Sequence, residues 1–434
     1  MNFSNLKKTY YYLKRNGIKR TLAAVEERCF FSYYRNYTYK KPQAGRLLRQ
    51  KEESKGKKLC FSIVVPVYET PKQYLKQLIL SLLEQTYPNW QLILADGGKT
   101  GEVKAALKDF RDERICYVGL EKNLGISDNT NAALAYVKGD YVGLLDHDDF
   151  LTPDALYEVE KAISRGREQG RDYTFLYSDE DKCEETGEVF YEPHFKTDFN
   201  LDLLLSNNYI CHFLVMKASV IKELGLRREY DGAQDYDLVL RMVEDIWNRG
   251  KVPEEEIYHI PRVLYHWRCH EASTAANPAS KSYAYQAGKR AIEDFCKRRS
   301  WQVLVQPLPY VGFYKVIYKD GIFSQREDVA AIGGKEIKKG KIVESIYDNQ
   351  GRALYEGIKG SHSGYVHRAA LTQNAQQLDV RKWQVNPAVL KKYETFFEAQ
   401  VSKEYTTQEE KRRSICEFLK KEGYRLYWDP DWRL

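Results

Sequence analysis

The sequence predicts an α/β fold built on a mostly parallel sheet. Four short apolar runs, rich in β-branched and aliphatic residues, alternate with segments whose apolar residues recur at helical spacing. This alternation is typical of parallel sheets, because the crossover that joins two parallel strands is usually a helix. With 434 residues, 43% of them hydrophobic, the chain is long and apolar enough for two or three packed domains.

The predicted strands are buried by composition and occupy residues 61–68, 90–95, 114–118 and 141–145. One helix is predicted between the first two strands from apolar residues spaced i, i+3, i+4, i+7 and i+8, namely Leu75, Leu78, Ile79, Leu82 and Leu83. A second helix is predicted over residues 129–137. A third is predicted to begin at Thr152 as its N-cap, with Pro153 in the first helical position.

Composition excludes several classes of protein. No apolar run approaches the roughly 20 residues that span a bilayer, and the N-terminus lacks the apolar core and small-residue cleavage site of a secretory signal. The cysteines form no CxxC pair, so we expect neither a zinc cluster nor a disulfide framework. These features predict a cytoplasmic protein in a reducing compartment.

Positive charge is concentrated in residues 1–58, which end in a polar, charged linker. This segment holds 16 Lys and Arg against 4 Asp and Glu, a net charge of +12, which leaves −5 for the rest of a chain of formal charge +7. Aromatic residues interleave with the basic ones, as suits the headgroup level of an anionic membrane. Packing on the main domain and nucleic-acid binding are the alternatives. We expect a basic helical arm in peripheral contact with an anionic membrane, and no nucleic-acid partner.

Polar residues follow three of the predicted strands at the point where each ends. Tyr68 follows the first strand, Asp96 the second, and residues 146–149 the fourth. Ligands of parallel sheets bind at the carboxyl ends of the strands. Asp146 and Asp148 lie on one short turn and can bind a hard divalent cation through their carboxylate oxygens. The alternative is an acidic turn that favours the start of the next helix.

Two further residues have both a chemical and a structural explanation. Asp235 precedes an apolar helical stretch, and it is either a general base positioned by the helix start or, like Asp237, an N-cap. His266 lies between Tyr265 and Trp267. It is either a partly buried histidine or the imidazole that completes a Mg²⁺ or Mn²⁺ site begun by carboxylates.

Together these segments resemble family 2 glycosyltransferases, whose GT-A fold is a nucleotide-diphospho-sugar transferase fold with a Rossmann-like sheet. The resemblance covers about residues 59–300, with the motifs in the family's order and spacing. The strings YSDEDK and HWR are similar to those of bacterial transferases that build O-antigens, capsules and rhamnose-rich wall polysaccharides. The other matching strings are FSIVVPVYE (61–69), SLLEQTYP (81–88), NLGISDNTNAAL (123–134), YVGLLDHDDFLTP (141–153), GAQDYDLVLR (232–241) and LYHWR (264–268).

The resemblance implies roles for individual residues. Asp235 matches the catalytic base, and one base with one direct displacement implies inversion at the anomeric carbon. Asp146, Asp148 and His266 match a site for Mg²⁺ or Mn²⁺. Residues expected to bind the nucleotide and donor sugar are Pro66, Tyr68, Glu69, Asp96, Asn123, Gly125, Asn131, Asp146, His147 and Asp148. Residues expected near the acceptor are Asp179, Asp181, Gln234, Trp267 and Arg268.

The chain departs from the family pattern beside the expected nucleobase position. The usual VDDGS string reads ADGGK at residues 95–99, Glu69 replaces an Asn, and Gln234 replaces the acidic first residue of the ED motif. The donor therefore stays open. The subset favours dTDP-rhamnose, with UDP-galactofuranose, UDP-galactose and UDP-N-acetylhexosamine as rivals.

From about residue 301 a further unit begins, and it is similar to the acceptor half of a second such module. Its matching strings are AAIGGK (330–335), SGYVHR (363–368) and GYRLYW (423–428). The nucleotide-binding half is missing, and Glu409 or Glu410 occupies the base position. We expect a degenerate, noncatalytic partial repeat that binds acceptor glycan, mediates assembly or is purely structural. The predicted domains are therefore residues 1–58, 59–300 and 301–434.

The expected function is inverting, metal-dependent transfer of a sugar from a dTDP or UDP donor. The expected acceptor is a cell-surface polysaccharide or a polyprenyl-linked glycan at the inner face of the cytoplasmic membrane. The metal would neutralise the leaving diphosphate, and the base would take the proton of the attacking hydroxyl. One alternative is a noncatalytic glycan- or nucleotide-binding scaffold that retains the fold. Another is a sugar nucleotidyltransferase, although its Gly-rich signature is missing.

Overall fold

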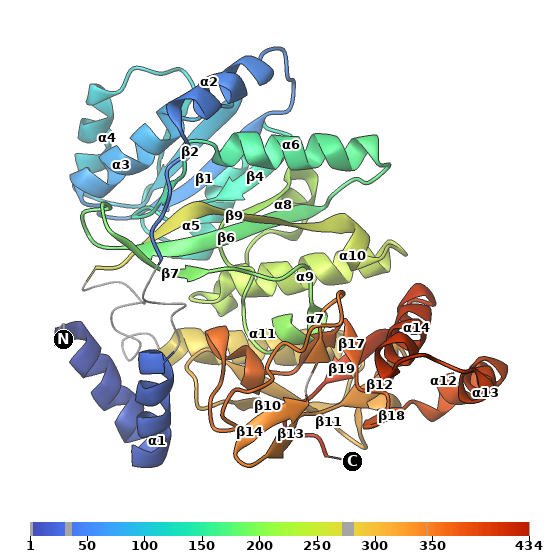
Figure 1. Ribbon diagram of the computed structural model, residues 1–434. Coiled ribbons are helices and arrows are strands. Elements are labelled where there is room, and N and C mark those ends of the chain that lie inside the picture. The colour runs from blue at the N-terminus through green and yellow to red at the C-terminus, as the bar shows by residue number, and fades with distance from the viewer. Residues whose placement is uncertain (1–2, 31–36, 271–281, 345, 434) are drawn as a thin grey trace. The chain divides into compact units, whose positions relative to one another are not determined.

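The computed structural model describes residues 3–30, 37–270, 282–344 and 346–433 (Figure 1). Residues 31–36 of the predicted arm and 271–281 of the predicted transferase domain lie outside this part. The chain divides into two compact units. The first unit comprises residues 32–199 and 209–295, and the second comprises residues 1–31, 200–208 and 296–434. The division at 58/59 and 300/301 that the sequence suggests stays a prediction.

A sheet of nine strands organises the described part of the first unit. The strands are β1 (Phe61–Val67), β2 (Trp90–Asp96), β3 (Ile115–Gly119), β4 (Tyr141–Leu144), β5 (Phe150–Leu151), β6 (Phe175–Cys183), β7 (Phe190–His194), β8 (Leu214–Lys217) and β9 (Ile257–Arg268). Their order is β3-β2-β1-β4-β8-β6-β9-β5, with β7 beside β6. The four strands predicted first pair in parallel, as expected.

The other half of the sheet is mixed rather than mostly parallel. Strand β8 pairs antiparallel with both β4 and β6, whereas β6 and β9 are parallel. Antiparallel neighbours need no helical crossover. The sequence of this half therefore lacks the regular strand–helix alternation that revealed the first four strands.

Helices accompany the sheet, some of them predicted from the sequence (72–83, 126–134 against the predicted 129–137, and the helix after Thr152) and others not. They are α2 (Ala44–Glu53), α3 (Lys72–Leu83), α4 (Glu102–Ala106), α5 (Ile126–Leu134), α6 (Ala155–Glu168), α8 (Ala218–Leu224), α9 (Gln234–Asn248), α10 (Pro253–Glu256) and α11 (Ser282–Arg298). Helix α6 begins at Ala155, later than predicted, and its N-cap is Asp154. The Thr152 hydroxyl instead donates a hydrogen bond to Asp154 Oδ1 at 3.1 Å, so it stabilises the turn before the helix.

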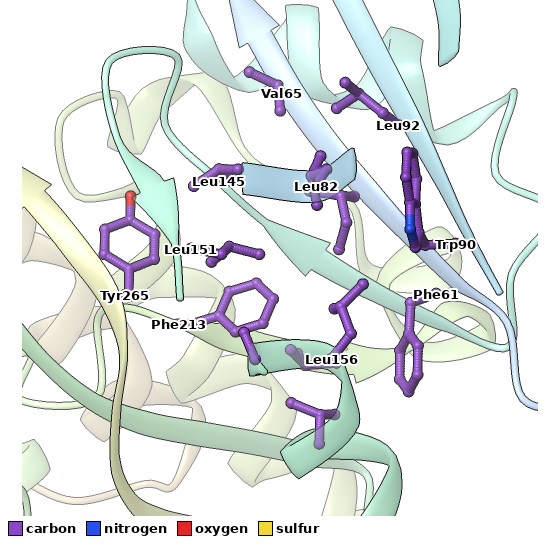
Figure 2. Close-up of a cluster of buried hydrophobic side chains, with 14 of the residues drawn as sticks. Phe61, Val65, Leu82, Trp90, Leu92, Leu145, Leu151, Leu156, Phe213 and Tyr265 are labelled. Atoms are coloured by element: carbon purple, nitrogen blue, oxygen red, sulfur yellow. The ribbon is translucent and has the colours of Figure 1, made fainter. Parts of the chain in front are cut away.

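The core of the first unit lies between the sheet and its helices. Figure 2 shows strand residues Phe61 and Leu92 gathered in one buried cluster with Leu82 of α3 and Leu156 of α6. Each of these side chains is buried. Burying a leucine or phenylalanine side chain contributes roughly 1.5–3 kcal/mol. This packing fixes the strands whose ends carry the predicted site.

The second unit contains small sheets and hairpins. Its strands are β10 (Val303–Pro307), β11 (Tyr314–Tyr318), β12 (Val329–Gly333), β13 (Glu336–Lys338), β14 (Lys341–Glu344), β15 (Ile346–Tyr347), β16 (Gln373–Ala375), β17 (Gln377–Leu378), β18 (Trp383–Val385) and β19 (Arg425–Trp428). Its helices are α1 (Phe3–Phe30), α7 (Leu201–Leu204), α12 (Pro387–Lys392), α13 (Glu394–Ser402) and α14 (Gln408–Lys421). In the described part of this unit, the sheet with the most strands has four, in the order β16-β19-β12-β18.

One arrangement in the second unit parallels the first. Strands β12 and β19 pair in parallel with α14 directly before β19, much as β6 and β9 pair in parallel with α9 between them in the chain. Glu409 lies in the first turn of α14, as Asp235 does in α9. Glu409 forms an ion pair with Arg413. This arrangement supports the predicted partial repeat, which stays a prediction.

The predicted basic arm is shared between the two units. Helix α1, broken at Gly17 where φ is 77°, belongs to the second unit, whereas α2 belongs to the first. In α2, Arg46 pairs with Asp154 and Glu158. Among the described residues, no helix is both long and apolar enough to traverse a lipid bilayer.

Candidate functional site

The loop after β4 carries the predicted acidic pair, and a third aspartate anchors it. Asp149 is fully buried. Its Oδ1 accepts the backbone N–H of Arg268 at 2.7 Å, and its Oδ2 accepts the Tyr265 hydroxyl at 2.5 Å. Burial and the neighbouring carboxylates of Asp148 and Asp146 raise the pKa of Asp149. Asp149 thus ties the acidic loop to β9.

Arg268, predicted near the acceptor, contacts this loop through its side chain. Its side chain is fully buried, Nε donates to the backbone oxygen of Asp148 at 2.6 Å, and Nη1 donates to the backbone oxygen of Glu185 at 2.5 Å. The guanidinium also lies over the rings of Tyr74 and Phe150. The contacts of Arg268 therefore hold the backbone of the acidic loop in place.

Asp146 lies beside a histidine that sequence reasoning did not single out. The Asp146 side chain is 48% exposed, and its Oδ2 is 3.8 Å from Nε2 of His212. Candidate ligand atoms of Asp146, Asp149 and His212 all lie within 4.8 Å of one another. The His212 ring stacks on Tyr265, with 4.5 Å between ring centroids and 7° between planes. His212 precedes β8, and no local pattern marks it.

A buried network fixes the orientation of His212. Its Nδ1 lies 3.1 Å from Oε2 of Glu180, which is 5% exposed. Glu180 also contacts His194 and the fully buried Nζ of Lys196. Burial would raise the pKa of Glu180, but Lys196 and the two histidines hold it well below its usual range. Burial would lower the pKa of His212, but Cys211 and Glu180 raise it well above its usual value.

The second predicted aspartate of the pair, Asp148, contacts a different histidine. Nε2 of His270 lies 2.8 Å from Asp148 Oδ2. Burial would raise the pKa of Asp148, but His270 and His147 lower it. His147 in turn lies 2.8 Å, through Nδ1, from the hydroxyl of buried Thr70 in the segment after β1.

His266, the predicted metal ligand, is 2% exposed and belongs to a different set of contacts. Its Nδ1 lies 2.5 Å from Oδ1 of Asp181, and its ring packs against Phe190 and Phe150. The Tyr37 hydroxyl donates to the other carboxylate oxygen of Asp181 at 2.6 Å. The structure therefore brings His212 and His270, rather than His266, directly to the acidic pair.

Two more residues predicted near the acceptor are the buried carboxylate of Asp179 and the indole ring of Trp267. Asp179 is 4% exposed, and its Oδ1 accepts the Lys196 backbone N–H and lies 2.8 Å from His259 Nε2. Trp267 is half-buried and lies 5.8 Å from the His212 ring, centroid to centroid. Asp179 and Asp181 thus underpin the site, whereas Trp267 lies close to it.

Asp235, the predicted base, occupies the first turn of α9. The N-cap of that helix is Ala233, so neither Asp235 nor Asp237 caps it. Oδ2 of Asp235 lies 3.7 Å from the thiol of Cys211. Burial is the largest cause that raises the pKa of Asp146, and His212 opposes it. The charges of Asp148 and Asp235 also raise the pKa of Asp146. Asp235 therefore lies close to the acidic pair.

The neighbours of Asp235 have structural partners. Asp237 is fully buried, accepts the Arg227 Nε–H at 3.0 Å and accepts the Arg241 Nε–H at 2.9 Å. Gln234 Oε1 accepts the Gly232 backbone N–H at 2.8 Å. Of the two aspartates in this motif, Asp237 locks the helix to the fold.

The ends of β1 and β2 carry the predicted nucleobase residues. Asp96 is 2% exposed; its Oδ1 accepts the Gly98 backbone N–H at 2.8 Å and its Oδ2 accepts the Tyr117 hydroxyl at 3.0 Å. Tyr68 is 49% exposed, and Glu69 beside it has a positive φ of 47°. Pro66 lies within β1, opposite Ala95.

The remaining donor-side predictions lie before and in α5. Asn123 Oδ1 accepts the Gly125 backbone N–H at 3.0 Å and the Asn129 side-chain amide at 2.9 Å. Gly125 has a φ of 97°, and a Cβ there would come within 2.7 Å of Asp231 Oδ2. Asn131 uses both atoms of its amide on the backbone of Leu226. Asn123 and Gly125 therefore shape the turn into α5, whereas Asn131 ties the helix to the backbone of Leu226.

The types of side chain at the acidic loop suit a divalent cation: candidate ligand atoms of Asp146, Asp149 and His212 lie near one another, and His270 contacts Asp148. Carboxylate oxygens suit Mg²⁺ and Mn²⁺, and imidazole nitrogen also suits transition metals. Asp146 and Asp148 offer the carboxylates, and His212 and His270 offer the imidazoles. Metal-binding histidines usually hold a carboxylate with the second ring nitrogen, as His212 holds Glu180.

Comparisons with known proteins match the motif-bearing segment. The profile described as "Glycosyl transferase family 2" matches residues 62–225. The chain is 30% identical over 207 residues to the "Putative colanic acid biosynthesis glycosyl transferase WcaA" of Escherichia coli K12, which covers 46% of this chain and 72% of that protein.

Two relatives are considerably longer than the segment they share with this chain. The "O-antigen biosynthesis protein RfbC" of Myxococcus xanthus is 33% identical over 242 residues, or 55% of this chain and 18% of that protein. The "Uncharacterized protein y4gI" of Sinorhizobium fredii is 41% identical over 256 residues, or 57% of this chain and 27% of that protein. This chain therefore spans under a third of the length of either relative.

Proposed function

Because this chain belongs to glycosyltransferase family 2, we propose that its first unit transfers a sugar from a nucleotide-diphosphate donor, with inversion at the anomeric carbon. The α/β sheet of this unit is the GT-A fold of that family. One observation carries the proposal. The dipeptide Cys211-His212 contacts the predicted base Asp235 through its thiol and Asp146 of the acidic pair through its imidazole. Asp235 and Asp146, the proposed base and one proposed metal ligand, therefore each contact one of two adjacent residues.

Asp235 is the proposed base for the acceptor hydroxyl. It lies in the first turn of a 15-residue helix, α9, beside the thiol of Cys211. As the hydroxyl oxygen attacks C1 of the donor sugar, its proton passes to a carboxylate oxygen of Asp235. The bond from C1 to the diphosphate breaks on the opposite face, which gives inversion.

Asp146, Asp148, His212 and His270 are the proposed holders of Mg²⁺ or Mn²⁺. When bound, the cation supplies charge neutralisation for the leaving diphosphate. Asp149 and Arg268 keep the loop that carries the carboxylates in register with β9. His266 stays a candidate ligand only if it exchanges its contact with Asp181.

The donor and acceptor are proposed from the sequence and from the relatives' names. Tyr68 and Asp96 are proposed to hold the nucleobase of a dTDP or UDP sugar, with dTDP-rhamnose favoured. RfbC is named for O-antigen biosynthesis and WcaA for colanic acid biosynthesis. These names support a cell-surface polysaccharide or its polyprenyl-linked precursor as the acceptor.

Donor turnover tests this function. The purified chain is incubated with Mn²⁺ or Mg²⁺ and a panel of nucleotide sugars, and released nucleoside diphosphate is measured. We expect release from one donor, with loss of at least two orders of magnitude in Asp235→Asn and in Asp148→Ala. Asp245→Asn is the matched control, because Asp245 lies on the same helix in an exposed ion pair with Arg249.

A thermal-shift series with the same panel covers the case in which water replaces the true acceptor poorly. Metal-dependent stabilisation by one donor without turnover would mean that the acceptor is missing from the assay. If no nucleotide sugar is turned over and none stabilises the chain, the transferase proposal fails and a noncatalytic scaffold becomes the better explanation.

We also propose that helix α1 contacts an anionic membrane at the cytoplasmic face. Ile18 and Leu22, one helical turn apart, are 67% and 63% exposed, and Lys19 is exposed beside them. Elsewhere on the helix, Glu27 accepts the backbone N–H groups of Ser363 and Gly364. An exposed apolar stripe flanked by basic residues suits the headgroup region of an anionic bilayer.

Vesicle co-sedimentation at low salt tests this contact. Ile18→Ser with Leu22→Ser should lower binding to vesicles that contain phosphatidylglycerol, and the control pair Leu304→Ser with Ile317→Ser removes two exposed apolar residues elsewhere in the same unit. Equal binding by both double variants would remove the membrane proposal.

A further inference from the structure

A basic cavity of about 510 Å³ lies in the first unit between α2, α6 and β9. It is separate in sequence from the acidic loop and from the base. Its cationic lining residues are Arg46, Arg49, Lys161, Arg165 and Arg262. Its carboxylates are those of Glu53 and Glu158, so the lining carries a formal charge of +3.

Two of the cations are already used within the protein. Arg46 Nη2 lies 2.6 Å from Glu158 Oε1 and 3.2 Å from Asp154 Oδ2, and Arg262 Nη1 lies 3.6 Å from Glu158. Glu53 accepts a hydrogen bond from the hydroxyl of Tyr157. The carboxylates that line the cavity therefore already have partners.

The other three cationic residues of the lining have no carboxylate partner among the described residues. Within the described part of the chain, Arg49, Lys161 and Arg165 form no ion pair, and both arginines are exposed. Nζ of Lys161 lies 5.5 Å from the ring centroid of Tyr157, which lines the same cavity. Arg49 comes from α2 and Arg165 from α6, so the charges face a shared space from two helices.

We propose that this cavity binds a phosphate or diphosphate group. Guanidinium groups pair with phosphate oxygens in a bidentate manner, and lysine adds a point charge. The acidic loop, in contrast, would repel a diphosphate in the absence of a metal ion. The cavity therefore gives the first unit a second anion site that needs no metal. Its natural ligand is a free phosphorylated compound or the phosphate of a lipid, and both share this chemistry.

Isothermal titration of inorganic pyrophosphate into the full chain, in buffer stripped of divalent cations, tests the proposal. We expect saturable binding that weakens at least tenfold in Arg49→Ala with Arg165→Ala. The control pair, Lys104→Ala with Lys108→Ala, removes the same charge from exposed positions of the same unit and should bind as the unchanged chain does. All four side chains are exposed, so we expect both double variants to melt at the temperature of the unchanged chain. Equal melting temperatures then verify that neither variant is unfolded.

The Asp148→Ala variant separates this proposal from the proposed function. It should retain metal-free pyrophosphate binding, whatever its effect on donor turnover. Absence of binding at millimolar pyrophosphate, or equal losses in the two charge pairs, would overturn the cavity proposal.

Vesicles containing phosphatidic acid distinguish the two sources of the phosphate. If the loss of Arg49 and Arg165 lowers vesicle binding as well as pyrophosphate affinity, the ligand is a lipid phosphate. If only pyrophosphate affinity falls, the ligand is a soluble phosphorylated compound. Both results support the site.

Discussion

Nδ1 of His212 lies 3.1 Å from Oε2 of Glu180, while Nε2 of the same ring lies 3.8 Å from Oδ2 of Asp146. The buried carboxylate orients the imidazole, and the second nitrogen is presented to the acidic loop. Carboxylate–histidine pairs of this kind commonly support metal ligands. We therefore propose a direct role for His212 and a positioning role for Glu180 in cation binding.

Replacing His212 tests that assignment. His212→Ala should weaken Mn²⁺ binding by about 10- to 100-fold, as measured by the electron paramagnetic resonance of free Mn²⁺ during titration. His194→Ala is the matched control, because His194 contacts the same Glu180 through Nδ1 at 3.3 Å and belongs to the same network. Equal affinities in the two variants would contradict a ligand role for His212.

His266, the histidine of the HWR string, and His270, which follows it, should behave differently when each is replaced. His270 contacts Asp148 directly, so His270→Ala should lower donor turnover by about 10- to 100-fold with little change in melting temperature. His266 is buried among aromatic rings, so His266→Ala should lower the free energy of unfolding by about 1–3 kcal/mol. A loss of metal affinity in His266→Ala alone would restore the ligand set suggested by the family resemblance.

The two aspartates at the start of α9 should also separate activity from stability. Asp237→Asn leaves Arg227 and Arg241 short of a buried partner, so the free energy of unfolding should fall by about 3 kcal/mol. Asp235→Asn should abolish transfer while the melting temperature stays within a few degrees. Urea denaturation and donor turnover of both variants check this contrast. Full activity in Asp235→Asn would exclude it as the base.

In the second unit, Asp328 should make stability depend on pH. Burial would raise its pKa, but Arg326 and Arg425 hold the pKa of Asp328 well below its usual range. A carboxyl with a depressed pKa in the folded state stabilises the fold above the unfolded pKa of about 3.9. This stabilisation is lost as the pH falls from that value through the folded pKa.

Asp328→Asn tests this dependence. The variant should be about 2–3 kcal/mol less stable than the unchanged chain at pH 7, and the difference should shrink as the pH falls from 4 to 2. Urea denaturation across this range measures it. Asp320→Asn, at a position whose side chain is exposed in the same unit, should show a constant small difference. A constant difference for Asp328→Asn as well would contradict the ion-pair explanation.

The sequence by itself determined the parallel half of the sheet, some of the helices beside it, the placement of Asp96 and Asp146 after strands, and that of Asp235 at the start of a helix. Strand composition, helical spacing and strand ends are local patterns, so they can be read without knowledge of the packing. The sequence left open whether Asp235 caps its helix, and the structure decided against it, because the N-cap is Ala233.

Only the tertiary structure decided which side chains meet the acidic loop. His212 is 32 residues from Glu180, and His270 is 122 residues from Asp148. Their contacts depend on how β8 enters between β4 and β6 and how β9 aligns with β6. His266 pairs with Asp181 because that alignment places the two opposite each other. Strand pairing over such separations is set by burial of the whole core, which no short motif encodes.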